Sequence, residues 1–474
     1  MRPLRSFFII LIFLVFFVGF HYVVPVSKWF PSAEEFLPGY IIQLVSPETE
    51  KPDTLHEVPK VQSEVLREIS SGIGQISDSV ATFYDSVPLN PLQKLYDSLV
   101  RPGGQTRIFY YGDSQIEGDR FTSYLRHTLQ EKYKGTGPGL FLPLMPVMYT
   151  KSIVLKASSN WRKYNYLSYK KKELSHNELG PFMAICRFLP EGDKTSEPVT
   201  AWVNIKPSTF ADSTSSVYDH LRLFYISREG PVVFSVKADG KYICREALLK
   251  TGLLSEVSCR INGAKDITLE FTGNVSPDIY GISIESQSGV IVDNIPQRGS
   301  AGLEFTMVDS SNLARSFRLL SPDLIVLQYG LNIVRNVRDE YNYYQRGLER
   351  QISLLNKIAP SVPVLVISVT DMASDDEGVI KSFSNIPAII AAQKKATEET
   401  GAVFWNSYSA MGGDSSIIRW SGMKPALAQK DFVHFTYSGA DTLSRILSEE
   451  IFTDRRLHPQ TPQGGLNPQT PQGG

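Results

Sequence analysis

The chain has 474 residues, which is long enough for two domains with linkers between them. Its 48 Lys and Arg residues are balanced by 49 Asp and Glu residues, so no basic surface for nucleic acid is expected. A hydrophobic fraction of 42% with 20% charged residues is typical of a globular protein.

The N-terminus combines a positive flank with a long apolar run. Arg2 and Arg5 precede residues 7–20, which carry no polar side chain, and the apolar character resumes after His21 and continues to Val26. Such a stretch approaches the roughly 20 residues that span a bilayer. No A-x-A cleavage site follows it, so we expect residues 1–26 to be an uncleaved signal anchor rather than a cleaved signal peptide. The positive-inside rule then predicts an exported protein on the periplasmic or cell-envelope face, anchored in the inner membrane.

Two further segments are expected to lie outside the folded domains. Residues 27–104 hold several prolines and acidic residues with apolar patches, and we interpret them as a membrane-proximal linker with short helices. At the C-terminus LHPQTPQGG is followed by LNPQTPQGG, a direct repeat. Pro, Gln and Gly cannot bury enough apolar area to fold, so residues 456–474 are predicted to be a disordered tail.

Buried strands alternate with amphipathic helices in residues 105–150 and 290–455, which predicts an α/β domain. Phe121, Leu125 and Leu129 recur every fourth residue, which places them on one helix face. Near-continuous apolar runs such as PVLVISVTD suit a parallel sheet covered on both faces. The expected strands include residues 107–112, 323–328, 363–371 and 402–408, and the expected helices include residues 116–133, 341–359, 386–400 and 439–452.

Residues 151–289 show a different pattern, with little helical periodicity. Short runs rich in β-branched and aromatic residues are separated there by Gly, Asn, Asp and Pro. Asp239 and Gly240 form the favoured two-residue turn of a hairpin. The pattern predicts a β-sandwich that interrupts the α/β domain. Its expected strands include residues 199–207, 220–228, 231–243, 267–273 and 280–286.

The chain has three cysteines, Cys186, Cys244 and Cys259. An exported compartment permits disulfides, and Cys244 and Cys259 are the candidate pair because they lie close together in one β-rich region. Zinc is not expected, because the sequence has no CxxC spacing and no flanking histidine.

A serine stands at the tip of the first expected strand, in the stretch RIFYYGDSQ. Serine is a poor nucleophile unless a neighbouring base removes its proton. Asp431 and His434 lie three residues apart just before the last expected helix, a spacing that can place both side chains on one side of a short turn. His434 is therefore a candidate base for Ser114, with Asp431 as its orienting partner. An ordinary structural histidine is the alternative.

Two loops offer hydrogen-bond donors for an oxyanion. Asn332 ends the strand-and-turn sequence DLIVLQYGLN, and the carboxyl end of a parallel strand faces the crevice where open α/β sheets bind ligands. The stretch RGSAG holds Gly299 and Gly302, and a glycine lets a backbone N–H approach a substrate oxygen closely. Ordinary turn and loop residues are the alternative at both places.

The order of these pieces resembles the block pattern of the SGNH (GDSL-type) hydrolases over residues 105–150 and 290–452. The resemblance implies a flavodoxin-like, three-layer α/β/α fold with a parallel sheet. It implies Ser114 as nucleophile, His434 as base and Asp431 as its partner, with no cofactor and no metal. It also implies an oxyanion hole formed by the Ser114 and Gly302 backbone N–H groups and the Asn332 side chain. Gly302 is preferred to Gly299 because it occupies the last position of an S-x-G-like block.

The first block departs from the commonest form, because GDSQ replaces GDSL. This variant, the glycine-rich GTGPGLFLP at residues 135–143 and the position of the insertion resemble peptidoglycan O-acetylesterases with an inserted carbohydrate-binding-like β-sandwich. Gln115 is expected either to line the site or to cap the following helix.

The chemistry that follows is ester hydrolysis, with an O-acetylated glycan as substrate. Peptidoglycan is the leading substrate by resemblance, and another acetylated polysaccharide is the alternative. Trp161, Tyr164 and Tyr166 are expected either to stack on sugar rings or to pack the core of the insert. An O-acetyltransferase or a non-catalytic glycan-binding protein is the rival function, and the sequence does not determine the oligomeric state.

Overall fold

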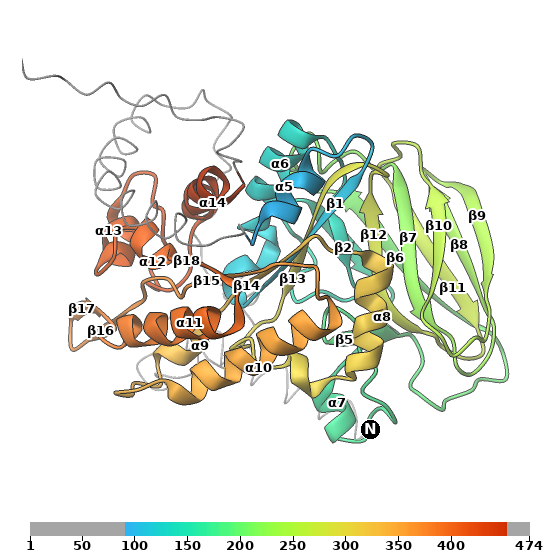
Figure 1. The fold of residues 1–474 in the computed structure, drawn as a ribbon. Helices are drawn as coiled ribbons and strands as arrows, with labels where there is room; N and C mark the ends of the chain where they lie inside the picture. The colour runs from blue at the N-terminus through green and yellow to red at the C-terminus, as the bar shows by residue number, and fades with distance from the viewer. Residues whose placement is uncertain (1–90, 453–474) are drawn as a thin grey trace, which may run out of the picture. The chain divides into compact units, whose positions relative to one another are not determined.

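The computed structural model describes residues 91–452, which belong to one compact unit (Figure 1). The expected anchor at residues 1–26, the expected tail at residues 456–474 and residues 27–90 of the expected linker lie outside this range. Within residues 91–452, none of the helices has the length and apolar character needed to cross a membrane.

A five-stranded parallel sheet forms the centre of the α/β part. When the strands of this sheet are numbered by their order in the sequence, the first lies between the second and the third. This is the 2-1-3-4-5 order of flavodoxin-like folds. Across the sheet the strands are β13 (Gly289–Pro296), β1 (Gln105–Gly112), β14 (Leu324–Gln328), β15 (Val364–Ile367) and β18 (Val403–Trp405).

Helices precede, connect and follow these strands in the sequence. The longer helices are α6 (Thr122–Tyr133), α8 (Ser310–Leu320), α10 (Asn342–Ile358), α11 (Ile386–Thr400) and α14 (Tyr437–Ile451). The shorter ones are α5 (Gln93–Leu99), η3 (Ser114–Asp119), α7 (Tyr166–Lys170), η4 (Phe305–Met307), α9 (Leu331–Val334), α12 (Ser407–Ala410) and α13 (Ser416–Gly422). A small hairpin of β16 (Ala373–Asp376) and β17 (Val379–Ser382) precedes α11.

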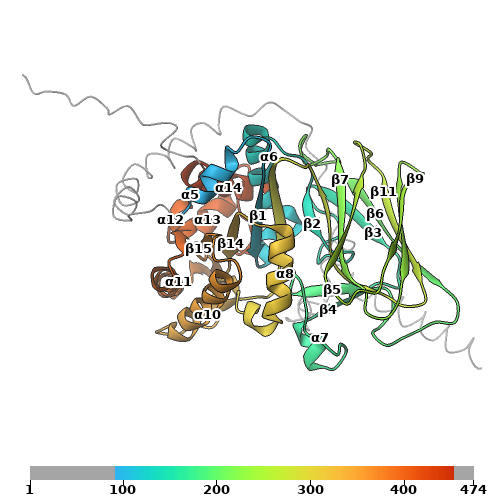
Figure 2. The ribbon, with the colours of Figure 1, turned by 45° about the vertical axis from the view of Figure 1, so that its right-hand side comes forward.

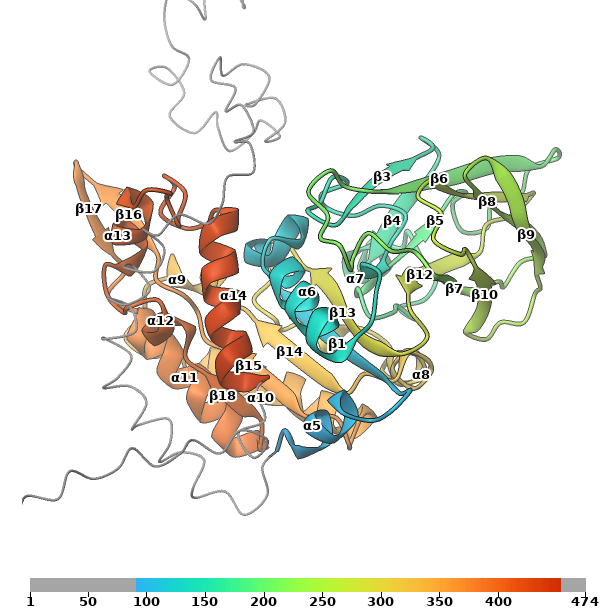
Figure 3. The same cartoon turned by 90° about the horizontal axis from the view of Figure 1, so that it is seen from above.

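Helices cover both faces of the parallel sheet, because successive side chains of a strand point to opposite faces. Ile108 and Tyr110 of β1 pack into the hydrophobic core that contains α5, α6 and α14. Phe109 and Tyr111 pack into the core that contains α8 and α10, and the rings of Phe109 and Phe317 meet edge to face with centroids 5.2 Å apart. The three-layer α/β/α fold expected from the sequence is therefore confirmed (Figure 3).

The remaining strands form two antiparallel sheets, which Figure 2 shows in green. One sheet runs β10-β7-β12-β5-β4 with β2 paired to β12, and the other runs β3-β6-β11-β8-β9. The strands are β2 (Gly139–Phe141), β3 (Ile153–Ala157), β4 (Arg162–Asn165), β5 (Ala184–Arg187), β6 (Val199–Pro207), β7 (His220–Ile226), β8 (Val232–Ala238), β9 (Lys241–Leu248), β10 (Ser255–Arg260), β11 (Ile267–Gly273) and β12 (Asp278–Glu285). The expected additional β-rich part is thus present.

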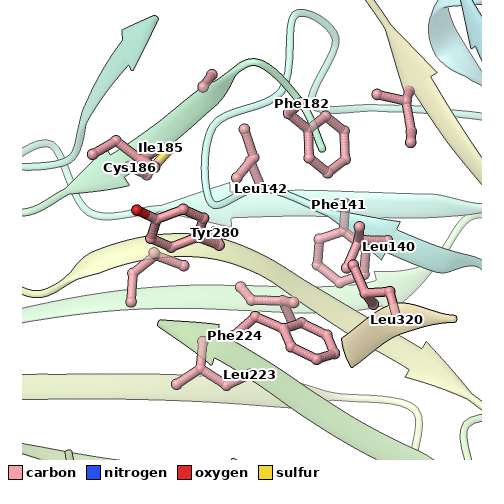
Figure 4. Packing of buried hydrophobic residues seen from close by; sticks show 14 of the residues in the cluster. Leu140, Phe141, Leu142, Phe182, Ile185, Cys186, Leu223, Phe224, Tyr280 and Leu320 are labelled. Carbon is pink, nitrogen blue, oxygen red and sulfur yellow. The ribbon is translucent and has the colours of Figure 1, made fainter. Parts of the chain in front are cut away.

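The sandwich begins earlier in the chain than the expected boundary at residue 151. β2 pairs with β12, with Phe141 opposite Ile282, although it lies within the segment that we assigned to the α/β part. At the other end, residues 286–288 alone separate β12 from β13. One hydrophobic core runs through both parts, and Figure 4 shows Leu320 of α8 beside Phe224 and Leu140 of the sandwich.

The aromatic residues that were candidates for sugar stacking lie mostly in the core of the sandwich. Trp161 is 5% exposed, and its ring meets Phe188 and Phe271 edge to face at 5.7 and 5.3 Å. Tyr164 is also buried, whereas Tyr166 is partly buried. The core-packing alternative is therefore the one that the structure supports for Trp161 and Tyr164, because a ring enclosed by other rings has no free face for a sugar.

All three cysteines are free thiols in the structure, which corrects the expectation of a bond between Cys244 and Cys259. The proximity of the pair was expected, and the two thiols do lie within hydrogen-bond contact. Burial, followed by the contact with the Cys244 thiol, raises the pKa of Cys259 to about 12. Cys186 is buried in β5, and burial raises its pKa to about 12 as well.

A buried ion network joins the parallel sheet to the sandwich. Arg107 of β1, 1% exposed, donates to Asp293 of β13 at 2.6 Å and to Glu285 of β12 at 2.8 Å. Glu285 also accepts from Arg222 of β7 at 3.0 Å. Burial alone would raise the pKa of Glu285, but the two arginine charges outweigh it and lower the pKa to about 2. The network joins β1 and β13 of the parallel sheet to β12 and β7 of the sandwich.

Replacing Arg107 by methionine should lower the free energy of unfolding by about 3–5 kcal/mol, because buried Asp293 loses its charged partner and buried Glu285 keeps only Arg222. Urea unfolding of the full chain followed by circular dichroism measures this change. The control is Arg260→Met, which removes an exposed arginine of β10 and should change the free energy of unfolding by no more than about 0.5 kcal/mol. Equal stability of the two variants would contradict the assigned role of the network.

Candidate active site

Ser114 lies at the carboxyl end of β1, in the turn that leads to the next helix. Gly112 ends the strand, and a Cβ at this position would lie 3.0 Å from the Gln328 carbonyl oxygen and from the Ile116 side chain. The Asp113 N–H donates to the same carbonyl at 3.3 Å, which fixes the start of the turn. Ser114 itself is partly exposed, so a substrate can reach it.

The helix after Ser114 begins later than the expected residue 116. Residues 114–119 form the 3-10 segment η3, and α6 starts at Thr122. Glu117 and Gly118 have non-helical backbone angles, with φ of Gly118 at +67°, which glycine adopts readily. As the first residue of η3, Ser114 has a backbone N–H for which the helix provides no acceptor.

His434 and Asp431 lie in a short loop that is closed by its own backbone hydrogen bonds. The Gln429 N–H donates to the His434 carbonyl at 2.8 Å, and the Thr436 N–H donates to the Leu427 carbonyl at 3.1 Å. The Thr436 side chain then caps the first turn of α14. The loop therefore has a defined shape immediately before the last helix.

The structure brings Ser114, His434 and Asp431 together in one hydrogen-bonded line. The Ser114 Oγ lies 2.9 Å from His434 Nε2, and His434 Nδ1 lies 2.7 Å from Asp431 Oδ2. An ionised carboxylate only accepts hydrogen bonds, so Nδ1 carries the proton and Nε2 is free to accept from the serine hydroxyl. This is the arrangement in which an imidazole can act as a base toward serine.

Asp431 is held in its ionised form by the loop around it. Its Oδ1 accepts the backbone N–H groups of Val433 and His434 at 2.9 and 3.0 Å. Burial alone would raise the pKa of Asp431, but the hydrogen bonds from the His434 ring and from the two backbone groups outweigh burial and lower it. The carboxylate therefore stays charged at neutral pH and holds the imidazole ring in place.

Asn332 and Gly302, which were expected to donate to an oxyanion, lie close together because both bond to Ser300. Asn332, at the start of α9, donates from Nδ2 to the Ser300 carbonyl at 2.8 Å, and the Gly302 N–H donates to Ser300 Oγ at 2.8 Å. The Asn332 amide has a second N–H that remains available to a ligand. The single N–H of Gly302 must leave Ser300 Oγ before it can serve an oxyanion.

The structure distinguishes the two glycines of the RGSAG loop. Gly302 is buried with φ of +77°, and a Cβ there would lie 2.6 Å from the ring of Tyr329. Gly299 is exposed, and a Cβ there would meet no atom within 4 Å. Both glycines have a positive φ, +76° at Gly299 and +77° at Gly302, but a neighbouring residue blocks a side chain only at Gly302.

Polar and aromatic groups lie at η3, the segment that begins with Ser114, and on the exposed surface of the molecule. Glu117 is buried in η3 and accepts two hydrogen bonds, at 2.7 and 2.6 Å, from the exposed guanidinium of Arg298. Tyr437, the first residue of α14, is 49% exposed, and its hydroxyl lies near Gly118. Tyr149 is exposed to a similar extent, at 48%. Within residues 91–452, no group of His, Cys, Asp and Glu side chains is arranged to hold a metal ion.

Sequence reasoning did not find the role of Gln115. The Gln115 side chain caps no helix: its amide donates from Nε2 to the Val433 carbonyl at 2.8 Å, and its Oε1 accepts the Phe435 N–H at 3.2 Å. Its position directly after Ser114 was the available signal, but the partners lie more than three hundred residues away.

Comparison with solved structures shows which known fold this chain resembles. The fold is similar to that of a peptidoglycan O-acetylesterase, with a TM-score of 0.59 and 17% identity over 77% of this chain and 95% of that one. An acetylxylan esterase from Geobacillus stearothermophilus shares 18% identity over 35% of this chain and 74% of its own, but its TM-score of 0.26 is too low to carry an argument. No protein-family model and no curated protein matches the chain. The first likeness confirms the fold expected from the resemblance to SGNH hydrolases.

Asp113, between Gly112 and Ser114, is a buried carboxyl group that is not part of the Ser114–His434–Asp431 line. Burial raises its pKa to about 6, and the hydrogen bond from the Gln115 N–H, at 3.1 Å, opposes only part of this effect. An acid whose pKa is raised on folding stabilises the protein below its unfolded pKa of about 4 and loses that contribution as the pH rises through the folded value.

Asp113→Asn should therefore remove a pH dependence of stability between about pH 4 and 6. At pH 4 the variant and the wild type should unfold at the same urea concentration, and at pH 7 the variant should be more stable by about 3 kcal/mol. Urea unfolding at steps of pH measures the difference, and the exposed Asp193→Asn serves as the control. A difference that is constant with pH would contradict the raised pKa.

Proposed function

We propose that the chain is a serine esterase that removes O-acetyl groups from a glycan of the cell envelope, with peptidoglycan as its leading substrate. The observation that carries the proposal is the line of hydrogen bonds from Ser114 through His434 to Asp431, at 2.9 and 2.7 Å. It lies at the carboxyl end of β1, where parallel α/β sheets bind their ligands.

In the proposed reaction Ser114 Oγ attacks the acetyl carbonyl carbon while His434 Nε2 accepts the hydroxyl proton. The electrons of the carbonyl π bond move to the carbonyl oxygen, which becomes the oxyanion of a tetrahedral intermediate. This intermediate then re-forms the carbonyl and breaks the bond to the sugar oxygen. The protonated imidazole gives its proton to that oxygen, and the sugar leaves as an alcohol. Water, deprotonated by His434, then attacks the acetyl-serine. The bond to Ser114 Oγ breaks, the imidazolium returns its proton to that oxygen, and acetate leaves.

The oxyanion is proposed to be held by the backbone N–H groups of Ser114 and Gly302 and by the side chain of Asn332. The free second N–H of Asn332 supports this role directly. Gly302 contributes once its N–H exchanges Ser300 Oγ for the more strongly accepting oxyanion.

Three features support an acetylated glycan as substrate. The exposed rings of Tyr437 and Tyr149 offer apolar faces on which a sugar ring can stack. An additional β-sandwich shares its core with the α/β part. The solved structure with the similar fold is described as a peptidoglycan O-acetylesterase. We further propose that the enzyme is exported and held at the inner membrane by residues 1–26, so that it faces the envelope.

Purified full-length chain in detergent should release acetate from O-acetylated peptidoglycan faster than from acetylated xylan or acetylated sialic acid. Ser114→Ala should lower the rate by about 10⁴-fold or more, because it removes the nucleophile. The control is Ser258→Ala, which removes an exposed hydroxyl of the sandwich and should leave the rate unchanged. Acetate release is measured by a coupled enzymatic assay.

Other outcomes of the same assay identify the rival functions. Full activity of Ser114→Ala would remove the nucleophile assignment. Transfer of most of the acetyl to an added sugar acceptor, in place of water, would establish an O-acetyltransferase. Binding of peptidoglycan with no acetate release from any substrate would indicate a non-catalytic glycan-binding protein.

Asn332→Ala should lower kcat by about 10²–10³-fold with a small change in KM, because an oxyanion donor acts mainly in the transition state. Kinetics with an acetylated aryl ester separate the two constants. Asn336→Ala, which alters an exposed asparagine four residues further along the chain, is the matched control. A loss in KM with unchanged kcat would assign Asn332 to substrate binding.

A further inference from the structure

Gln115 joins the segment of the nucleophile to the loop of the base. It is 2% exposed and directly follows Ser114. Its Nε2 donates to the Val433 carbonyl at 2.8 Å, and its Oε1 accepts the Phe435 N–H at 3.2 Å. These two backbone groups belong to the residues immediately before and after His434, so one side chain binds the main chain on both sides of the base.

The hydrogen bonds around His434 fall into two sets. The His434 N–H donates to Asp431 Oδ1 at 3.0 Å, and its carbonyl accepts the Gln429 N–H at 2.8 Å. The C=O and N–H of one trans peptide group point to opposite sides, so the Val433 carbonyl points away from the His434 N–H, and the Phe435 N–H points away from the His434 carbonyl. Gln115 occupies this second side. All four backbone groups that determine the direction of the His434 side chain are therefore bonded.

Few hydrogen bonds connect the segment of Ser114 with the loop of His434. Within the described part of the chain, residues 113–119 and residues 427–437 are joined by the two bonds of Gln115 and by the bond between Ser114 and His434. The Ser114–His434 bond must break and re-form during a reaction, because the proton leaves the serine. The bonds of Gln115 take no part in the proton transfer and can persist through it.

We propose that Gln115 is a positioning residue that holds His434 Nε2 within reach of Ser114 Oγ throughout the catalytic cycle. The inference rests on the proposed esterase function. A glutamine suits this task because its amide presents one acceptor and two donors at a fixed angle. Leucine has a similar size but offers neither, and an ionised glutamate offers acceptors alone.

Replacing Gln115 by leucine should lower kcat toward an acetylated aryl ester by about 10–100-fold with less than about a twofold change in KM, because a displaced base misaligns the proton transfer. Gln115→Glu keeps an acceptor for the Phe435 N–H and adds a negative charge next to the imidazole. It should also move the acid limb of the kcat/KM profile to higher pH, since the charge favours the protonated ring. This shift reports how close residue 115 lies to the imidazole, whereas the kcat loss of Gln115→Leu reports the positioning role.

Gln130→Leu is the matched control. Gln130 is 1% exposed, and its Nε2 donates to the carbonyls of Gly137 and Val290 at 3.1 Å each. Val290 lies near the amino end of β13, the opposite end of the sheet from Ser114. This variant should lose stability as Gln115→Leu does, with kcat and the pH profile unchanged.

Hydrogen exchange of the Phe435 amide tests the inference without an activity measurement. The amide should exchange about tenfold or more faster in full-length Gln115→Leu than in the wild type, and at the wild-type rate in Gln115→Glu and Gln130→Leu. Mass spectrometry with fragmentation resolves this amide, and Gln115→Ala, whose side chain also offers neither donor nor acceptor, serves the same comparison if the leucine variant does not fold.

The outcomes separate the two proposals. A wild type that hydrolyses no ester would overturn the proposed function, whereas the exchange rates would still show whether Gln115 holds the loop. Unchanged kcat in a folded Gln115→Leu, or a kcat loss equal to that of Gln130→Leu, would overturn the positioning role. An unchanged exchange rate of the Phe435 amide in Gln115→Leu would overturn it as well.

Discussion

The register of the parallel sheet is the constraint on which the candidate site depends. Gly112, the last residue of β1, lies opposite Pro296 of β13 and Gln328 of β14. Because these strands run parallel, the segments that follow them emerge at one edge of the sheet. Ser114 and the two loops with candidate oxyanion donors therefore meet at this edge, although long stretches of sequence separate them.

His434 reaches the same edge through helix packing. Its loop precedes α14, and α14 packs against α6, the helix that follows Ser114 and η3 (Figure 3). Helix packing alone leaves freedom in a connecting loop, and the hydrogen bonds of Asp431 and Gln115 remove it. Asp431, the charged residue that bonds the loop, belongs to the loop itself. Gln115, the neutral residue that bonds it, belongs to the segment of Ser114.

Local patterns predicted much of this fold, and their failures have a common cause. The α/β order, the β-rich insertion and the order of the polar residues follow from periodicity and spacing, which neighbouring residues determine. The expected helix from residue 116 was wrong at its start because Gly118 takes a left-handed conformation there. Trp161 is of a residue type that can stack on sugar rings. Its burial depends on Phe188 and Phe271, which lie elsewhere in the sequence.

The sequence by itself determined the class of fold and the candidates Ser114, Asp431, His434, Gly302 and Asn332. Only the tertiary structure decided their distances, the membership of β2 in the sandwich sheet, the unbonded state of the cysteines and the partners of Gln115. The physical reason is that periodicity reports which face of an element is buried. Contacts between residues 114 and 434 depend on how the sheet and its helices pack, and no single segment of the chain contains that information.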